Sequence, residues 1–237
     1  MASPAALVVP ALKRHTSTVI VAHGLGDTGN GWMFLAESWR RKNKFEETAF
    51  VFPHAPHIPI TLNMGMRMPG WYDILSFDDL NVREDNPGIE RSQAYFHSLI
   101  KSEMDKGIPS ERIVLGGFSQ GGAMSLLAGI TCPVKLGGIF GLSSYLLLQG
   151  KIRDMVPKDN PNKDTPIFMG HGDADQVVRY EWGQKTAQKL KEWGWSVKFN
   201  TYRGLPHSAD PQEIDDLERY LKERIPDLGE AAGKEAL

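Results

Sequence analysis

The sequence contains a single cysteine among its 237 residues, Cys132, so no disulfide can form within the chain. This is typical of a protein from a reducing compartment, and we expect a cytoplasmic location. A net charge of −2 and the lack of any basic run argue against nucleic-acid binding. Neither secretion nor membrane insertion is expected, because the short apolar stretch 5–12 contains Pro10 and is followed by Lys13 and Arg14, the reverse of a secretory signal.

Metal-ligand spacing is also missing. No pair of histidines follows the His-x-x-x-His pattern, and Cys132 has no second thiol to act with. We therefore assign no metal to the histidines that stand outside the main motifs and expect no cofactor; these histidines are His23, His54, His57 and His171.

What the chain does have is enough apolar sequence, 41% of its residues, for one α/β core. Apolar strands alternate with amphipathic helical stretches such as 180–193, which predicts a mostly parallel central sheet with helices on both faces and no large cap domain. We expect one domain over 1–237. Within it, 1–15 is a lead-in, 157–166 is a connector and 226–237 is a frayed tail.

A Gly-x-Ser-x-Gly motif at 117–121 lies between the β-branched stretch 112–115 and the small-residue helical stretch 123–130. A serine on such a tight turn from strand to helix points its oxygen out of the fold, and the flanking glycines remove Cβ atoms that would block the turn. The pattern predicts that Ser119 is a nucleophile. A solvated serine in an ordinary glycine-rich turn is the alternative, but it would not require an acid and a histidine later in the chain.

Both partners follow in the order acid, then histidine, which is the order used by α/β-hydrolases. A short buried strand predicted over 165–169 leads into a loop over 171–178, where Asp173 and Asp175 compete for the acid role. We favour Asp175, since it lies farther beyond the strand end, and interpret Asp173 as a turn residue bonding local amides. Strand 197–202 leads to His207, the predicted base, which precedes the helical stretch 211–225.

Stabilising an oxyanion requires two donors, and backbone amides are the usual source. Gln120 follows the nucleophile at a predicted helix N-terminus, where unpaired amides favour negative charge. The second amide is expected in the glycine-rich loop 23–29, after the apolar strand 18–22. The alternative, a phosphate-binding loop, is disfavoured because the loop has neither the Lys-Ser/Thr ending of a P-loop nor Gly-x-Gly-x-x-Gly spacing.

The chain resembles acyl-protein thioesterases of the type 1 and type 2 group, in the phospholipase/carboxylesterase family of α/β-hydrolases. The matching runs span nearly the whole chain; they are 23–29 with Gly31 and Trp32, 53–56, 68–74, 116–122, 141–143, 171–173 and 204–207. Carried over, the nucleophile falls on Ser119, the acid on Asp175 and the base on His207. The oxyanion amides fall on Leu25 and Gln120.

The resemblance also implies the substrates: long-chain acyl thioesters on protein cysteines, with lysophospholipids and simple esters as secondary ones. The methionine-rich, irregular segment 61–75 fits a flexible acyl chain, although each methionine there is also compatible with a plain core position. We expect an acyl groove lined by Trp71, Ile74, Leu75, Tyr145, Val177 and Leu205. Family members commonly carry a tryptophan near Tyr145 and Leu146, and this departure bears on groove width.

The expected mechanism is two-step nucleophilic catalysis through an acyl-enzyme on Ser119, without a cofactor. A general carboxylesterase or lysophospholipase is the nearer alternative, and a non-catalytic hydrolase-fold receptor is the more distant one. Membrane contact is expected to be transient, because no cysteine near the N-terminus offers a site for acyl anchoring. A nuclear pool and a weak homodimer through an exposed apolar Trp71 segment are further expectations.

Overall fold

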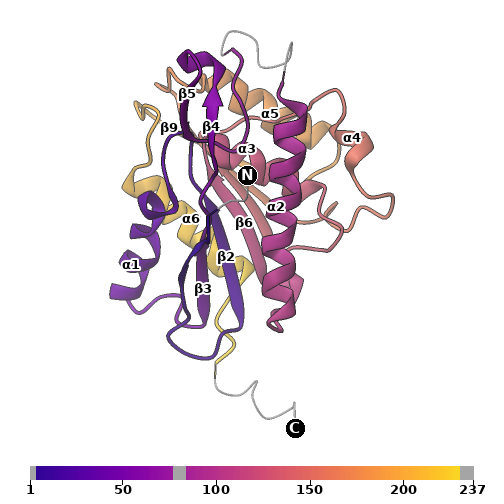
Figure 1. Cartoon of the computed structure of the whole chain (residues 1–237). Coiled ribbons are helices and arrows are strands. Elements are labelled where there is room, and N and C mark those ends of the chain that lie inside the picture. The colour runs from indigo at the N-terminus through magenta and orange to yellow at the C-terminus, as the bar shows by residue number, and fades with distance from the viewer. Residues whose placement is uncertain (1–3, 77–83, 230–237) are drawn as a thin grey trace.

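A seven-stranded sheet forms the centre of the molecule in the computed structural model, which describes residues 4–76 and 84–229 (Figure 1). Its spatial order is β1-β3-β2-β6-β7-β8-β9, and only β1 runs antiparallel to its neighbour. The strands are β1 (Leu7–Val9), β2 (Ser17–Ala22), β3 (Thr48–Phe52), β6 (Ile113–Phe118), β7 (Gly138–Leu142), β8 (Ile167–Gly172) and β9 (Val197–Tyr202).

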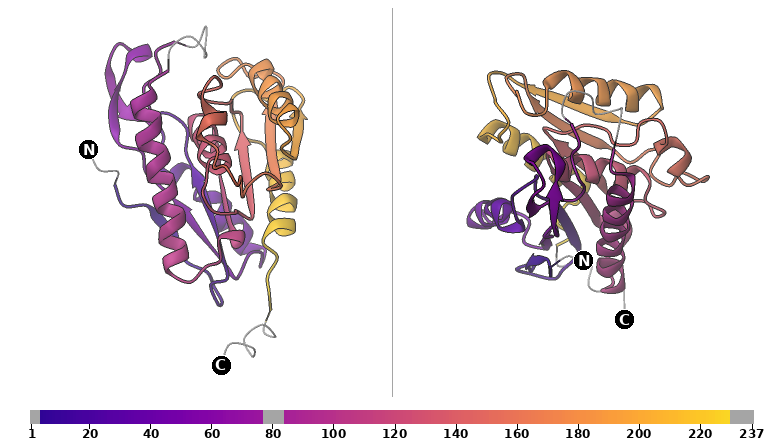
Figure 2. Two further views of the ribbon diagram at one scale, coloured as in Figure 1. Left: turned by 90° about the vertical axis from the view of Figure 1, so that its right-hand side faces the viewer. Right: turned by 45° about the horizontal axis from the view of Figure 1, so that its top comes forward.

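Helices cover both faces of this sheet, because its inner strands are apolar on both sides (Figure 2). In β2, Ile20 and Ala22 belong to the core cluster on the face covered by α2, α3 and α5, whereas Val19 and Val21 belong to the cluster on the face covered by α1 and α6. The helices are α1 (Phe34–Arg41), α2 (Asn86–Asp105), α3 (Gln120–Ile130), the short α4 (Ile152–Met155), α5 (Tyr180–Glu192) and α6 (Pro211–Arg224). The predicted fold class, a mostly parallel sheet between helical layers without a large cap, is confirmed.

The strand order of the sheet reverses between β2 and β6. From β2 the chain adds β3 on one side, and from β6 onward it adds strands on the other. Ligands bind at the carboxyl ends of parallel strands where the strand order reverses in this way. The glycine-rich loop after β2 and the Ser119 turn after β6 therefore start at the switch point.

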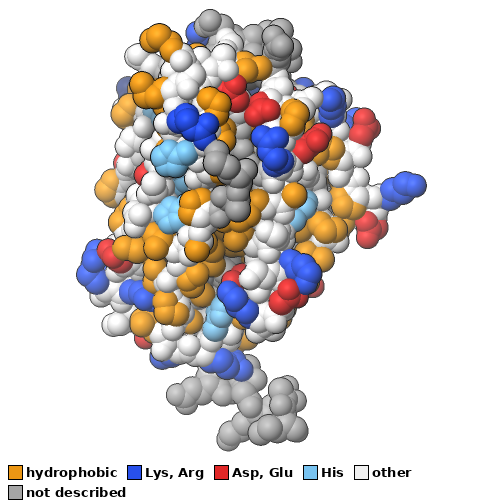
Figure 3. All heavy atoms as spheres, viewed as in Figure 1, with side chains coloured by type: hydrophobic (Ala, Val, Ile, Leu, Met, Phe, Trp, Pro, Cys, Tyr) orange, Lys and Arg blue, Asp and Glu red, His pale blue; other side chains and the backbone are white. Residues whose placement is uncertain are grey.

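A two-stranded hairpin outside the main sheet, β4 (His57–Ile60) with β5 (Met66–Pro69), carries the methionine-rich segment. Met64 at its tip is fully exposed, and Met66 and Leu62 are also exposed. Figure 3 shows hydrophobic side chains over this hairpin at the top of the molecule. The tip methionines are thus neither core nor cavity residues.

The lead-in predicted over 1–15 contains strand β1, in which Leu7 to Val9 pair with residues 50–52 at the sheet edge. One predicted strand boundary was wrong. The strand predicted over 165–169 starts two residues later and ends three residues later, as β8, and its end is later because His171 and Gly172 keep pairing with β9 inside the fold. In the predicted tail 226–237, residues 230–237 lie outside the described residues.

Candidate active site

Ser119 occupies a strained turn between β6 and α3. Its φ of 53° and ψ of −122° are rare for a residue with a side chain. The turn is tight because Gly121 lies against β2, where an added Cβ would come within 2.3 Å of the Ala22 carbonyl oxygen. Ala123 N–H donates to the Ser119 carbonyl at 2.9 Å, which starts the helix immediately behind the serine. The glycine spacing therefore produces the exposed serine that the motif predicts.

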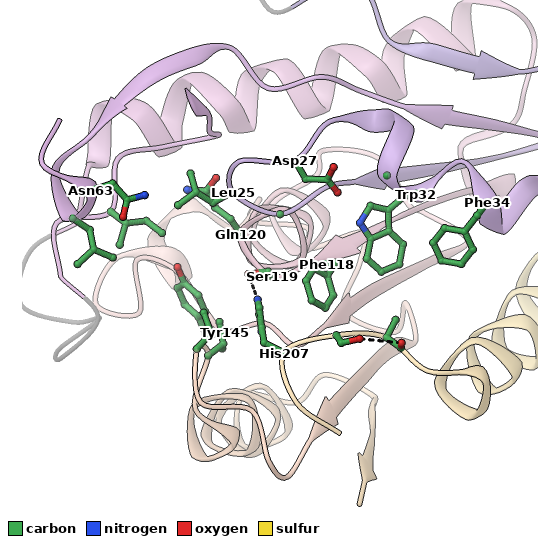
Figure 4. A pocket seen from close by; sticks show the side chains of 18 residues that line it. Leu25, Asp27, Trp32, Phe34, Asn63, Phe118, Ser119, Gln120, Tyr145 and His207 are labelled. Atoms are coloured by element: carbon green, nitrogen blue, oxygen red, sulfur yellow. Dashed lines mark hydrogen bonds between the residues drawn. The ribbon is translucent and has the colours of Figure 1, made fainter. Parts of the chain in front are cut away.

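Three side chains from separate loops form one hydrogen-bonded chain. The Ser119 hydroxyl lies 2.9 Å from His207 Nε2 (Figure 4). His207 Nδ1 lies 2.7 Å from Asp175 Oδ2. These loops follow β6, β8 and β9, so the parallel sheet brings together residues 88 and 32 positions apart. With its proton on Nδ1, the imidazole has Nε2 available to take the serine proton.

Backbone hydrogen bonds to Oδ1, the second oxygen of the carboxylate, hold Asp175 in place. The N–H groups of Val177 and Val178 both donate to Oδ1 at 2.9 Å, while the whole carboxylate is shielded from solvent. Burial raises the pKa of this carboxyl, but hydrogen bonding to His171 and His207, the His207 charge and the Val177 amide together hold the pKa below its usual range. The carboxylate therefore stays ionised at neutral pH and stabilises an imidazolium at His207.

The competing acid, Asp173, lies outside this chain. It is exposed at the end of β8, and its Oδ1 accepts the Gly204 N–H at 2.6 Å. Gly204 is in the loop that carries His207, so Asp173 ties the two loops together rather than bonding the local amides that were predicted. It has no contact with the imidazole among the hydrogen bonds of the described chain.

Two buried titratable groups lie behind the triad and were not assigned roles from the sequence. His171 is fully buried in β8; its Nε2–H donates to the Val178 carbonyl at 2.8 Å and lies 3.5 Å from Asp175 Oδ2. Glu213 in the first turn of α6 is also fully buried, and neither carboxyl oxygen has a hydrogen-bond partner among the described residues. Burial, then the charges of Asp210 and Asp175, raise the pKa of Glu213 to about 8.

Because of this pKa, we expect Glu213→Gln to gain stability relative to the wild type as pH rises from 5 to 8. The folded chain keeps a proton on Glu213 that the unfolded chain releases near pH 4.5, so the wild type is destabilised across this window. Glutamine has no such proton. Between pH 5 and pH 8, the difference in free energy of unfolding between the variant and the wild type should therefore shift in favour of the variant by about 3.5 kcal/mol.

Urea denaturation at pH 5 and pH 8 measures this shift. Glu223→Gln, at an exposed position of the same helix, is the matched control and should show no pH-dependent difference. If the Glu213→Gln and wild-type stability curves run parallel between pH 5 and 8, Glu213 does not hold a proton in the folded state.

The two residues predicted to supply oxyanion amides, Leu25 and Gln120, lie beside the nucleophile. Gln120 is the first residue of α3, so its N–H precedes the helical hydrogen-bond pattern and has no carbonyl partner within the helix. Leu25 belongs to the glycine-rich loop, and Gly24, Leu25, Ser119 and Gln120 line one cavity. Figure 4 shows Leu25 and Gln120 on the same side of Ser119. This is the arrangement expected of oxyanion donors.

A buried network connects the segments that carry Gln120 and Leu25. The Gln120 side chain accepts the Trp71 N–H at 2.8 Å and donates to the Tyr72 carbonyl at 2.7 Å. The Trp71 indole N–H donates to the His23 carbonyl at 2.8 Å, and His23 Nε2 accepts the Ala55 N–H. Trp71 thus links the helix that carries Gln120 to the start of the Leu25 loop.

A cavity of about 550 Å³ opens around Ser119. Ile74, Tyr145 and Val177 line it, as predicted, but Trp71, Leu75 and Leu205 do not. Trp71 is 2% exposed and belongs to the network beneath the oxyanion loop, whereas Leu205 packs against Gly172 under the His207 loop. Leu75 lines a separate small hollow. Adjacency in sequence did not indicate which side chains of these loops turn inward.

Tyr145, at the position where the expected tryptophan is missing, is buried with its hydroxyl 2.7 Å from that of Tyr72. Burial raises the pKa of Tyr145 to about 12, so both hydroxyls stay neutral. The ring forms part of the cavity wall while the polar end is satisfied inside the protein. The wall at this position is therefore fixed by a hydrogen bond.

Several cavity residues were not assigned roles from the sequence. They come mainly from the segment between β2 and α1 and from the hairpin, and they are Asp27, Gly31, Trp32, Phe34, Leu62, Asn63, Phe118, Ser208 and Ala209. The Gly31-Trp32 pair was part of the family resemblance and was the available signal for this wall. Phe34 had no sequence signal, because it begins an ordinary amphipathic helix.

The sheet order and the turn at Ser119 define an α/β-hydrolase fold. Solved structures with this fold include Arabidopsis thaliana SOBER1, with a TM-score of 0.82 and 30% identity over 89% of this chain and 99% of that one. Zea mays acyl-protein thioesterase 2 has a TM-score of 0.81 and 28% identity, covering 93% of this chain and 98% of that one.

The phospholipase/carboxylesterase family model matches residues 3–225, and the chain belongs to this family. Acyl-protein thioesterase 1 of Neurospora crassa is 57% identical over 94% of this chain and 93% of that protein. The protein of the same name from Emericella nidulans is 56% identical, over 94% and 97%.

Proposed function

We propose that the chain is a serine hydrolase that removes long-chain acyl groups from protein cysteines, with Ser119, His207 and Asp175 as its catalytic triad. The hydrogen-bonded chain from Asp175 to Ser119, which opens into the 550 Å³ cavity, carries this proposal. The close similarity to proteins named acyl-protein thioesterase 1 supports the choice of substrate. We expect these three side chains to act together as one catalytic unit.

In the first step, Ser119 Oγ attacks the acyl carbonyl carbon while its proton moves to His207 Nε2. The carbonyl oxygen becomes an oxyanion held by the N–H groups of Gln120 and Leu25. As the tetrahedral intermediate collapses, the carbon–sulfur bond breaks, and His207 gives its proton to the leaving thiolate. This leaves an ester between the acyl group and Ser119.

In the second step, water attacks this ester. His207 takes a proton from the water and then returns one to Ser119 Oγ as the fatty acid leaves. Asp175 remains ionised throughout, consistent with its lowered pKa, and stabilises the imidazolium each time it forms. The cycle uses only this chain's own groups, a substrate and water.

Part of the cavity wall suits an acyl chain. Leu62, Ile74, Tyr145 and Val177 present apolar surface there. Burial of each methylene contributes about 0.8 kcal/mol, so kcat/KM should rise about fourfold per methylene until this part of the cavity is filled.

The test is a series of thioesters of one cysteine peptide, with acyl chains from four to sixteen carbons, beside a palmitoyl lysophospholipid. We expect kcat/KM to rise with chain length and the palmitoyl peptide to be a better substrate than the lysophospholipid. A preference for the shortest thioester or for the lysophospholipid would assign the chain to the general carboxylesterases or lysophospholipases instead.

We infer that the protein acts in the cytoplasm, with nuclear access, and meets membranes only briefly to reach its substrates. In the described residues, no helix is both long and apolar enough to cross a membrane. The exposed Met64 and Met66 lie on the hairpin whose Leu62 reaches the cavity, which supports contact of this end with a lipid surface. A homodimer through the Trp71 segment lacks support, because Trp71 and Ile74 are buried.

A further inference from the structure

The cavity extends in two directions from Ser119. Tyr145 and Asn63 lie on one side of the nucleophile, and Trp32 and Phe34 lie on the other (Figure 4). The first side has a buried wall formed by Ile74 at 5% and Tyr145 at 4% exposure, and its other apolar residues, Leu62 and Val177, are 37% and 45% exposed. The second side ends at Phe34, which is 44% exposed. This second, open side therefore reaches the surface of the molecule at Phe34.

A row of aromatic rings follows the open side. The Phe118 ring centroid lies 4.7 Å from that of His207 and 5.2 Å from that of Trp32. Trp32 in turn lies 5.8 Å from Phe34 at the start of α1. The row therefore leads from the proposed catalytic base to the surface without a break.

A surface groove continues this direction. It occupies about 280 Å³ between α1 and α6, and shares Phe34 and Ala209 with the cavity around Ser119. Ser38 of α1 and Ile214 of α6 form its further walls. An extended segment leaving Ser119 along the aromatic row would enter this groove.

The chemistry places the leaving group on this side. His207 Nε2 must reach the sulfur to protonate it, so the sulfur lies beside the imidazole, whose ring packs on Phe118. In a protein substrate the acylated cysteine continues into a chain on both sides, and such a chain needs a groove along the surface. The open aromatic side leads into such a groove and accommodates the chain, and the side with Ile74 and Tyr145 accommodates the acyl tail.

We propose that Phe34, with Trp32 and Ala209, forms a subsite for an apolar side chain that neighbours the acylated cysteine in a protein substrate. The proposal rests on the proposed thioesterase function and adds a preference for the sequence around the cysteine. An apolar neighbour covers the exposed Phe34 ring, whereas glycine leaves it in water. We expect the wild type to favour apolar-flanked over glycine-flanked peptides about tenfold in kcat/KM.

The test compares two peptides carrying the same S-palmitoyl cysteine, one flanked on both sides by leucine and the other by glycine. Both give the same acyl-enzyme, so a difference in kcat/KM reports the leaving group during the first step. In Phe34→Ala the ratio between the peptides should fall from about ten to about two or less. Leu12→Ala removes a similarly exposed side chain elsewhere and should keep the wild-type ratio.

A wild-type ratio near one, or a ratio that Phe34→Ala leaves unchanged, would overturn the subsite. The subsite would also be overturned if Phe34→Ala changed the dependence of kcat/KM on acyl chain length instead of the peptide ratio. The open side would then hold the acyl tail. The same peptides with O-palmitoyl serine separate this result from the proposed function. Turnover of the serine esters alone would refute the thioesterase function while still measuring the flanking preference.

Discussion

Replacing Ser119 by alanine is expected to lower kcat for a palmitoyl thioester peptide by about 10⁴- to 10⁶-fold. Without Oγ no acyl-enzyme can form, and any remaining rate comes from water attacking a carbonyl polarised by the Gln120 and Leu25 amides. The backbone of the turn is fixed by Gly121 against β2, so the variant should fold as the wild type does. Steady-state kinetics, with circular dichroism to verify folding, measures the loss.

Ser98→Ala provides the matched control, because Ser98 is an exposed serine on α2 whose hydroxyl bonds only within its own helix. It should keep wild-type activity. Because nucleophile and base act as one unit, His207→Ala combined with Ser119→Ala should be little worse than Ser119→Ala alone. A Ser119→Ala variant with more than about a tenth of wild-type activity would remove Ser119 from the mechanism.

The second large effect is expected for Asp175→Asn, with a fall in kcat of about 10³- to 10⁴-fold. The two valine amides that now donate to Oδ1 should hold the new amide oxygen in that place. The amide NH₂ would then face His207 Nδ1, and Nδ1 must accept a hydrogen bond from it. The imidazole therefore carries its proton on Nε2 instead. In that tautomer the imidazole cannot take the proton of Ser119.

Asp173→Asn is the comparison that decides between the two acids. Asp173 bonds the Gly204 N–H and not the imidazole, and asparagine keeps an oxygen for that contact. We therefore expect kcat to remain within about threefold of wild type. If Asp173→Asn abolishes activity and Asp175→Asn does not, the acid has been assigned to the wrong residue.

Chain order and spacing predicted which three side chains meet, because parallel strands place their following loops at one edge of the sheet. They did not predict where the strand before the acid ends. His171 resembles a loop residue in sequence, yet it is buried in β8, where its ring nitrogen bonds the Val178 carbonyl. Pairing with β9 extended the strand, and such pairing is not visible locally.

The cavity walls were harder to predict than the triad. Trp71 belongs to a run that resembles the family's groove loop, but its indole N–H bonds the His23 carbonyl and its side chain is buried. Phe34 and Trp32 line the open side because the turn before α1 places the Trp32 ring against Phe118, next to Ser119. Which face of an irregular segment turns inward depends on distant partners, and composition alone does not contain that information.

The most direct test of the account is to trap the acyl-enzyme. Wild-type protein is mixed with a palmitoyl thioester peptide, quenched with acid within one turnover and analysed by mass spectrometry of its proteolytic fragments. We predict a palmitoyl group on the fragment containing Ser119, formed as fast as the peptide thiol is released, and no such adduct in Ser119→Ala. Thiol release at the same rate in both proteins, without an adduct on Ser119, would contradict the mechanism.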